Sequence, residues 1–214
     1  MANYTWGKSI DNGSSFGSAP FDPFNIASNR GLSDFDMKQY FVTSFIWDLP
    51  KLSTHEFLAK NFVNGWELNS IVTFHDGTPF SVVSGVDNSE SGVGADNADR
   101  VPGVSRQLSH SSKAAEIAEY FNINAFTLNQ VGTFGDSGRN NLYGPGTENI
   151  DMAVVKTLYS RGDLGKVLFR GEAFNLFNHT NLGGPTANVS SSTFGEITSA
   201  GAPRVLQLAL RLEF

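Results

Sequence analysis

A period of two over the last ten positions, Val205–Phe214, in which every second residue is a large apolar one, constrains this chain more than any other feature. Successive side chains of a β-strand point to opposite faces, so a period of two predicts a strand with two unlike faces. One face is purely apolar and consists of Leu206, Leu208, Leu210, Leu212 and Phe214. The other face carries Val205, Gln207, Ala209, Arg211 and Glu213. The chain therefore ends in a predicted amphipathic strand that separates two different environments.

The same period recurs upstream, and helical periodicity is weak outside a short segment, Lys113–Tyr120. Five further segments are predicted strands: Asn3–Ser9, Asp36–Asp48, Asn64–His75, Ile150–Tyr159 and Leu164–Phe177. With the last segment they make about six strands of roughly 9–13 residues. Such strands are longer than those of typical soluble domains, and a tilted strand of this length is long enough to span a bilayer.

Each predicted strand is assigned an apolar face from its alternation. For the second strand, the apolar face is Met37, Phe41, Phe45 and Trp47. For the third strand, it is Trp66, Leu68, Val72 and Phe74. For the fifth strand, the apolar face is Val167, Phe169, Gly171 and Ala173, opposite Lys166, Arg170 and Glu172. For the fourth strand, the pattern favours Ala153, Val155, Thr157 and Tyr159, opposite Lys156.

The connections between these strands alternate in length. Residues 11–34, 76–149 and 178–203 form long connections, whereas residues 49–62 and 160–163 form shorter ones. Bacterial membrane barrels alternate short periplasmic turns with longer extracellular loops. The pattern predicts an all-β fold: an antiparallel meander of about six long strands forming part of a transmembrane outer-membrane β-barrel, with long extracellular loops. A soluble β-sandwich also alternates, although a loop of about 70 residues is rare in a compact domain.

Composition narrows the function classes. The net charge of −6 provides no basic patch for nucleic acid, and the absence of cysteine excludes disulfides and thiolate sites. The sequence contains no run of about 18 apolar residues, so it predicts no membrane-spanning helix. The first residues, Met1–Trp6, lack the basic and apolar regions of a signal peptide, so we expect the sequence to begin within a longer protein.

Three segments resemble a known family, the Oar-like TonB-dependent receptors. They are Tyr4–Asp11 (YTWGKSID), Gly138–Gly146 (GRNNLYGPG) and Phe169–His179 (FRGEAFNLFNH), the last followed by Phe194–Thr198 and the final strand. This resemblance implies that residues 1–214 are the C-terminal segment of a receptor barrel of about 22 strands, with plug, TonB box and signal peptide absent from the sequence. TonB would then be a partner only through the missing N-terminal part.

The last strand resembles the signal that the outer-membrane barrel-assembly machinery reads, because a terminal aromatic follows alternating apolar residues. We predict this role for Leu206, Leu208, Leu210, Leu212 and Phe214. On the opposite face we predict lumen-facing charges, for which cross-strand pairing is the favoured role. These residues are Lys166, Arg170, Glu172, Arg211 and Glu213.

No catalytic, cofactor-binding or metal site is predicted. The acidic residues of one Gly- and Ser-rich loop do not follow a calcium-binding pattern, so a solvated loop is favoured for Asp87, Glu90, Asp96 and Asp99. The histidines lack metal-ligand spacing and are assigned to loops, girdles or turns: His55, His75, His110 and His179.

Taken together, these patterns predict a non-enzymatic part of an outer-membrane receptor that takes up a solute, with membrane lipid and the assembly machinery as partners. Two alternatives stay open. One is an adhesin-like or structural surface β-protein, and the other is a secreted carbohydrate-binding sandwich.

Overall fold

The computed structural model describes residues 1–15, 19–51, 53, 62–92, 94, 96–160 and 165–214. Its main element is a six-stranded sheet in which each strand pairs with its neighbours in antiparallel register. In spatial order the strands are β1 (Ala2–Trp6), β4 (Gln39–Asp48), β5 (Trp66–His75), β10 (Thr147–Ser160), β11 (Lys166–Phe174) and β12 (Val205–Glu213). The predicted antiparallel meander of six long strands is confirmed.

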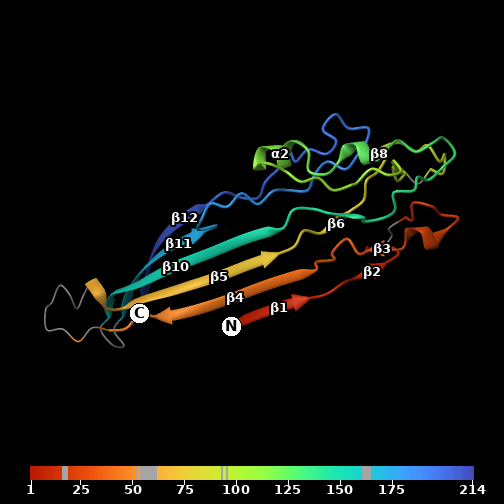
Figure 1. The fold of residues 1–214 in the computed structure, drawn as a ribbon. Coiled ribbons are helices and arrows are strands. Elements are labelled where there is room, and N and C mark those ends of the chain that lie inside the picture. Colours follow the sequence, from red (N-terminus) through yellow and green to blue (C-terminus); the bar gives the residue numbers. More distant parts are fainter. Residues whose placement is uncertain (16–18, 52, 54–61, 93, 95, 161–164) are drawn as a thin grey trace.

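The two ends of the sheet differ, as the connection lengths predicted. The described residues of 7–38, 76–146 and 175–204 leave the strands at one end of the sheet (Figure 1), whereas Asp48 of β4 and Glu67 of β5 pair at the other end. Within the described residues, β1 and β12 each pair with a single neighbour, so the sheet is open at both edges.

The two faces of the sheet follow from the strand register, because paired residues share a face. Leu208 pairs with Gly171, and Leu210 pairs with Phe169, which places the leucines of β12 beside the apolar residues of β11. Phe41 pairs with Phe74, and their rings stack with centroids 6.4 Å apart. We name this side the apolar face: Phe41, Phe45, Trp47, Leu68, Val72, Met152, Val154, Val167, Phe169, Leu206, Leu208, Leu210 and Leu212.

The face assignment for β10 was wrong. Ala153 pairs with Glu172, and Val155 pairs with Arg170, so both lie on the polar side of the sheet. Lys156 instead lies on the apolar face, opposite Phe169. Its Nζ lies 5.2 Å from the ring centroid of Trp66 and donates to the carbonyl of Asn64 at the strand end. A long lysine can share an apolar surface when its head reaches a polar group, which period-two reasoning does not anticipate.

A register shift explains the rest of that error. The pairing of β10 with β11 is irregular between Thr157 and Tyr159. Beyond this β-bulge, Tyr159 pairs with Val167 and joins the apolar face, whereas Thr157 lies on the polar side. One extra residue exchanges the two faces of a strand, so Thr157 and Tyr159 do not share a face as the alternation suggested.

The long connections fold into a compact body of their own. We define the loop cap as the described residues of 7–38, 76–146 and 175–204. It contains three short β-pairs and three short helices, which Figure 1 places beyond the strand ends. These are β2 (Ile10–Asp11) with β3 (Gly31–Leu32), β6 (Pro79–Phe80) with β9 (Leu142–Tyr143), β7 (Asp99–Arg100) with β8 (Phe126–Thr127), η1 (Ile26–Asn29), α2 (Lys113–Ala118) and η2 (Ile123–Ala125).

The main hydrophobic core of the described residues lies in the loop cap, not in the sheet. Phe121 is 2% exposed, and its ring contacts Phe126 edge-on at 5.7 Å and Phe194 at 5.3 Å. Around it pack residues from two of the three long connections, 76–146 and 175–204, the latter contributing Phe194 and Val189. The other buried members are Val82, Ala98, Ala125, Phe126 and Leu142. The connections therefore hold one another in place through apolar burial.

Helix α2 confirms the helix expected within Lys113–Tyr120. Ser112 caps its first turn, with the side-chain oxygen accepting from the Ala115 N–H at 3.2 Å. The helix ends at Ala118, and the backbone of Glu119 after it is extended. None of the helices in the described part of the chain is long and apolar enough to cross a membrane.

Candidate functional site

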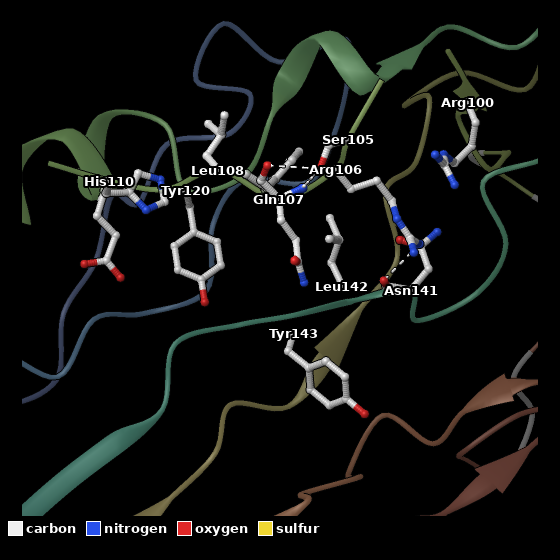
Figure 2. A pocket seen from close by; sticks show the side chains of 12 residues that line it. Arg100, Ser105, Arg106, Gln107, Leu108, His110, Tyr120, Asn141, Leu142 and Tyr143 are labelled. Atoms are coloured by element: carbon white, nitrogen blue, oxygen red, sulfur yellow. Dashed lines mark hydrogen bonds between the residues drawn. The ribbon is translucent and has the colours of Figure 1, made fainter. Parts of the chain in front are cut away.

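A cavity of about 690 Å³ opens in the loop cap between α2, the preceding loop and β9. Its walls combine positive, polar and aromatic side chains, which Figure 2 shows converging from three segments of the chain. The lining residues are Arg100, Ser105, Arg106, Gln107, Leu108, His110, Glu116, Tyr120, Phe121, Asn141, Leu142 and Tyr143. A site of this size and mixed polarity has the dimensions of a small-molecule pocket.

Two guanidinium groups lie at one end of this cavity, next to Asn141 (Figure 2). Arg106 donates to the carbonyl of Asn141 at 3.1 Å. Arg100 reaches only the carbonyl of Val104, at 3.5 Å, and its buried Nε has no hydrogen-bond partner. Burial, and then the nearby positive charge of Arg100, lower the pKa of Arg106. Within the described residues, neither arginine forms an ion pair with a carboxylate.

The other end of the cavity is aromatic. His110 and Tyr120 stack with ring centroids 6.5 Å apart, and His110 Nε2 lies 2.7 Å from the carbonyl of Glu119. Burial, followed by the charge of Glu116, raises the pKa of Tyr120 to about 12. Glu116 is the one carboxylate among the lining residues, and it lies 3.4 Å from Lys113, which provides its counter-charge.

A second arginine site has the opposite character. Arg139 is only 9% exposed, and it contacts Asp11 at 2.5 Å and Asp34 at 2.8 Å. It also donates to Ser14 at 2.6 Å. These contacts join residues more than a hundred positions apart and tie the first loop to the long one. We name Arg139 with Asp11, Ser14 and Asp34 the arginine clamp.

Polar contacts in and near the arginine clamp shift the pKa of two groups, Asp11 and Tyr143. The hydrogen bond from Ser33, opposed by burial and reinforced by Ser14 and Arg139, lowers the pKa of Asp11 from 3.8 to about 2. Nearby, Tyr143 donates to the buried carboxylate of Asp36 at 3.0 Å. Burial and this hydrogen bond raise the pKa of Tyr143 to about 12. These contacts therefore favour the ionised form of Asp11 and the neutral form of Tyr143.

The backbone permits the arginine clamp to form. Asn140 adopts a φ of +51° and donates from its amide to Leu32 at 2.7 Å and to Asp34 at 2.6 Å. A Cβ at Gly31 would lie 2.7 Å from the carbonyl oxygen of Arg139. Only glycine allows this approach, so the Gly-Arg-Asn segment and Gly31 form one structural unit.

The acidic loop is solvated only in part, because Asp87 and Glu90 are exposed as expected but Asp96 is buried. Asp96 is 2% exposed and accepts from the Ser89 N–H at 2.8 Å, from Ser89 Oγ at 2.7 Å and from Asn129 at 2.9 Å. Asp87 accepts from the amides of Ser91 and Gly92. No three potential metal-ligating side chains converge among the residues placed in the structure. Both carboxylates organise the loop through hydrogen bonds, Asp96 from a buried position and Asp87 at the surface.

The histidines that the structure describes occupy loops and a strand end. His75 ends β5 and stacks on Tyr40 at 5.6 Å, and His179 lies in the last loop, with Nε2 3.8 Å from Glu148. His110 lines the cavity described above. His55 lies outside the described residues.

Comparison with known proteins identifies the chain at the level of the family. Residues 1–207 match the family described as "Outer membrane beta barrel domain". The chain belongs to this family. Its place is therefore the outer membrane, and its six-stranded meander is part of the wall of such a barrel domain. Searches of curated proteins and of solved structures returned no match.

In this barrel domain, the residues predicted as an assembly signal project from an open edge strand. Leu206, Leu208, Leu210 and Leu212 are each about 70% exposed on the apolar face, and Phe214 is fully exposed after the strand ends. The structure thus presents these side chains together, while their recognition by an assembly machinery stays a prediction.

The five predicted lumen-facing charges all lie on the face opposite the leucines, because Lys166 pairs with Glu213 and Leu168 pairs with Arg211. Their ion pairs do not run across strands as expected. Among the described residues, Arg170 contacts Glu172 at 2.7 Å and Arg211 contacts Glu213 at 3.2 Å, both along a single strand. Residues two apart on a strand share a face, so each pair forms locally.

Sequence reasoning missed the residues of the cavity and of the arginine clamp. Arg100 and Arg106 carry no motif, and they line one cavity with Asn141 only because the loop cap brings these segments together. Arg139 and Asn140 lay within the Gly138–Gly146 motif. A charged and an amide side chain within this glycine-rich segment were the signal that could have indicated a contact between loops.

Proposed function

We propose that this barrel domain is part of an Oar-like TonB-dependent receptor that takes up a solute across the outer membrane, and that it has no enzymatic role. In this proposal residues 1–214 form the C-terminal wall and loops of a larger barrel, and a plug and a TonB box belong to the rest of the protein. The observation that carries the proposal is the loop cap, which folds around its own core and contains a polar cavity.

The organisation of the loop cap supports a receptor. Long loops of bacterial barrels lie outside the cell, where a solute arrives first. Loops packed on a common core hold a binding surface in one shape, which favours recognition because less conformational entropy is lost on binding. An adhesin or structural barrel would need no such cavity.

The segments that resemble the receptor family support the same proposal, because their side chains hold the loops. Arg139 and Asn140 of the second segment form junctions with the first loop. In the third segment, Asn175 has a φ of +52° and its side chain accepts from the His179 N–H at 2.9 Å and donates to the Ala202 carbonyl. The resemblance thus covers the residues on which the loop architecture depends.

The faces of the sheet fit a barrel wall. In the proposed arrangement the apolar face contacts lipid, and Lys166, Arg170, Glu172, Arg211 and Glu213 face the lumen or plug. Unpaired backbone groups cannot remain at a lipid-exposed edge, so β1 and β12 pair with further strands of the complete barrel.

Contact with TonB tests the transport proposal. We expect the complete protein, in native membranes, to crosslink to the periplasmic domain of TonB. We also expect removal of TonB to abolish growth on the solute to the same extent as deletion of the gene for this protein. A complete protein without TonB contact, whose deletion alters only surface attachment, would instead show an adhesin.

Deletion of Phe214 tests the assembly signal. We propose that the terminal aromatic and the leucines of β12 are read during insertion, so the deletion should lower the amount of complete protein in the outer membrane. The matched control is Phe177→Ala, which removes an exposed phenylalanine of the loop cap. Equal surface amounts of the Phe214 deletion and the unchanged protein, at native expression, would contradict this role.

A further inference from the structure

The cavity of the loop cap holds two positive charges without counter-ions. Arg100 and Arg106 lie at the same end, near Asn141 (Figure 2), and none of the described carboxylates lies within ion-pair distance of either. Every hydrogen bond that their guanidinium groups make is to a neutral backbone carbonyl, of Val104 or Asn141. The buried Nε of Arg100 remains without a partner.

This arrangement is unfavourable in the empty protein. Bringing two guanidinium groups together in a partly buried site costs free energy through desolvation and mutual repulsion. The lowered pKa of Arg106 has both causes, burial first and the charge of Arg100 second. An anion between the two arginines would remove the repulsion and provide acceptors for the free N–H groups.

The arginine clamp shows how the same fold treats an arginine with a structural role. Arg139 has two carboxylates and a hydroxyl within hydrogen-bond distance. Arg100 and Arg106 have none of these groups, although Asp136 is close enough to accept from the Arg100 backbone N–H at 2.6 Å. The absence of such acceptors around the cavity arginines therefore indicates a ligand. At the cavity, this ligand would provide the acceptors that the chain itself provides at the arginine clamp.

The size and the other lining residues of the cavity indicate the size and polarity of the rest of that ligand. A volume of about 690 Å³ exceeds the needs of an inorganic anion. Gln107 and Ser105 offer polar groups, and Tyr120 offers a ring toward the other end. Such a lining suits a hydroxylated body of about the size of a sugar.

We propose that Arg100 and Arg106 bind the carboxylate, sulfate or phosphate group of an acidic, sugar-sized solute in this cavity. The inference deepens the proposed receptor function by naming the chemical class of its solute. It concerns equilibrium binding by the loop cap, which requires neither TonB nor an energised membrane. Failure of the binding experiment and failure of the TonB experiment are therefore distinguishable.

The test measures Kd for the complete protein in detergent by isothermal titration calorimetry. The probes are glucuronate, glucose 6-phosphate and inorganic sulfate, with glucose as the uncharged control. We expect an anionic sugar to bind at least roughly tenfold more tightly than glucose. Arg100→Gln and Arg106→Gln should each weaken that binding by about tenfold or more, and Arg100→Lys should weaken it less.

Arg30→Gln is the matched control, because Arg30 is an exposed arginine of the loop cap outside the cavity. It changes the net charge equally and should leave Kd unchanged. If a cavity variant fails to fold, phenylglyoxal labelling of the unchanged protein tests the same contact. Bound glucuronate or glucose 6-phosphate should protect Arg100 and Arg106 from reaction with phenylglyoxal. The proposal is overturned if no anionic probe binds, if glucose binds as tightly, or if both arginines stay reactive with ligand present.

Discussion

The sheet and the loop cap place their apolar side chains in opposite ways. In β12, Leu208 is 75% exposed, and the other leucines of that strand are similarly open. In the loop cap, Val82 is fully buried and Phe121 is 2% exposed. The cap completes its hydrophobic core within the described chain, whereas the sheet leaves its apolar face for an outside medium. The difference shows one chain built for two solvents, water around the cap and lipid around the strands.

The largest expected effect is on the core of the loop cap. Phe121→Ala should destabilise the cap by about 3–5 kcal/mol, because it leaves a cavity among Phe126, Phe194 and their neighbours. Hydrogen exchange of cap amides, compared with strand amides of the complete protein in lipid, measures this. The control Phe177→Ala removes a 72% exposed ring and should change little. Uniform loss of protection in cap and strands would refute the separation of the two regions.

A substitution pair on β12 tests the other side of the comparison. Leu208→Lys should destabilise the lipid-inserted barrel by about 2–4 kcal/mol, because it places a charge on the apolar face at mid-strand. Gln207→Lys places the same charge on the opposite face, beside Glu172, and should have little effect. Denaturant unfolding of both variants in vesicles provides the measurement. Equal destabilisation would mean that the two faces do not meet lipid and lumen as proposed.

The two kinds of arginine contact extend the comparison to charged residues. Arg139→Gln should destabilise the loop cap by about 1.5–3 kcal/mol, because Asp11 and Asp34 lose charge-assisted hydrogen bonds from a buried partner. Arg170→Gln on the sheet should cost at most about 1 kcal/mol, because its pair with Glu172 is half exposed. Proteolysis of the cap and unfolding of the barrel report the two effects. A larger loss from Arg170→Gln would reverse this ranking.

The smallest expected effect is the pH dependence of Asp11. Its folded pKa of about 2 lies below the ordinary 3.8, so its ionised form stabilises the cap at pH values above 3.8. That contribution should fall as the pH drops through the folded pKa. Asp11→Asn removes the titrating group, and solvent exposure keeps the difference small. The difference in cap protection between the variant and the unchanged protein should shrink below pH 4; a difference that grows there would contradict the assigned shift.

Local pattern was sufficient to predict the strands, but not every face. The alternation in β12 and β11 gave the correct sides for Leu208 and Phe169, because each strand is regular over its length. The same reasoning failed in β10, where Lys156 lies over Trp66 and a β-bulge interrupts the period. A bulge and a lysine reaching a strand end both depend on neighbouring strands, so the pattern within one segment does not contain them.

The candidate site was beyond prediction for a related reason. Arg100 and Asn141 are far apart in sequence, and the loops between them show no period that would place them together. The expected solvated loop around Asp96 failed in the same way, because burial of that carboxylate depends on Ser89 and Asn129. Contacts between distant residues of irregular loops are decided by packing, which composition and local spacing do not encode.

By itself, the sequence determined the six strands, their antiparallel order and the alternation of long and short connections. These features follow from a period of two and from turn spacing, which are properties of adjacent residues. Only the tertiary structure decided that two of the long loops share a core around Phe121 and that Arg139 joins the first loop to the long one. It also decided that Arg100 and Arg106 line one cavity without a carboxylate partner among the described residues. The physical reason is that burial and ion pairing depend on which distant segments come into contact, and that choice is made by the packing of the whole chain.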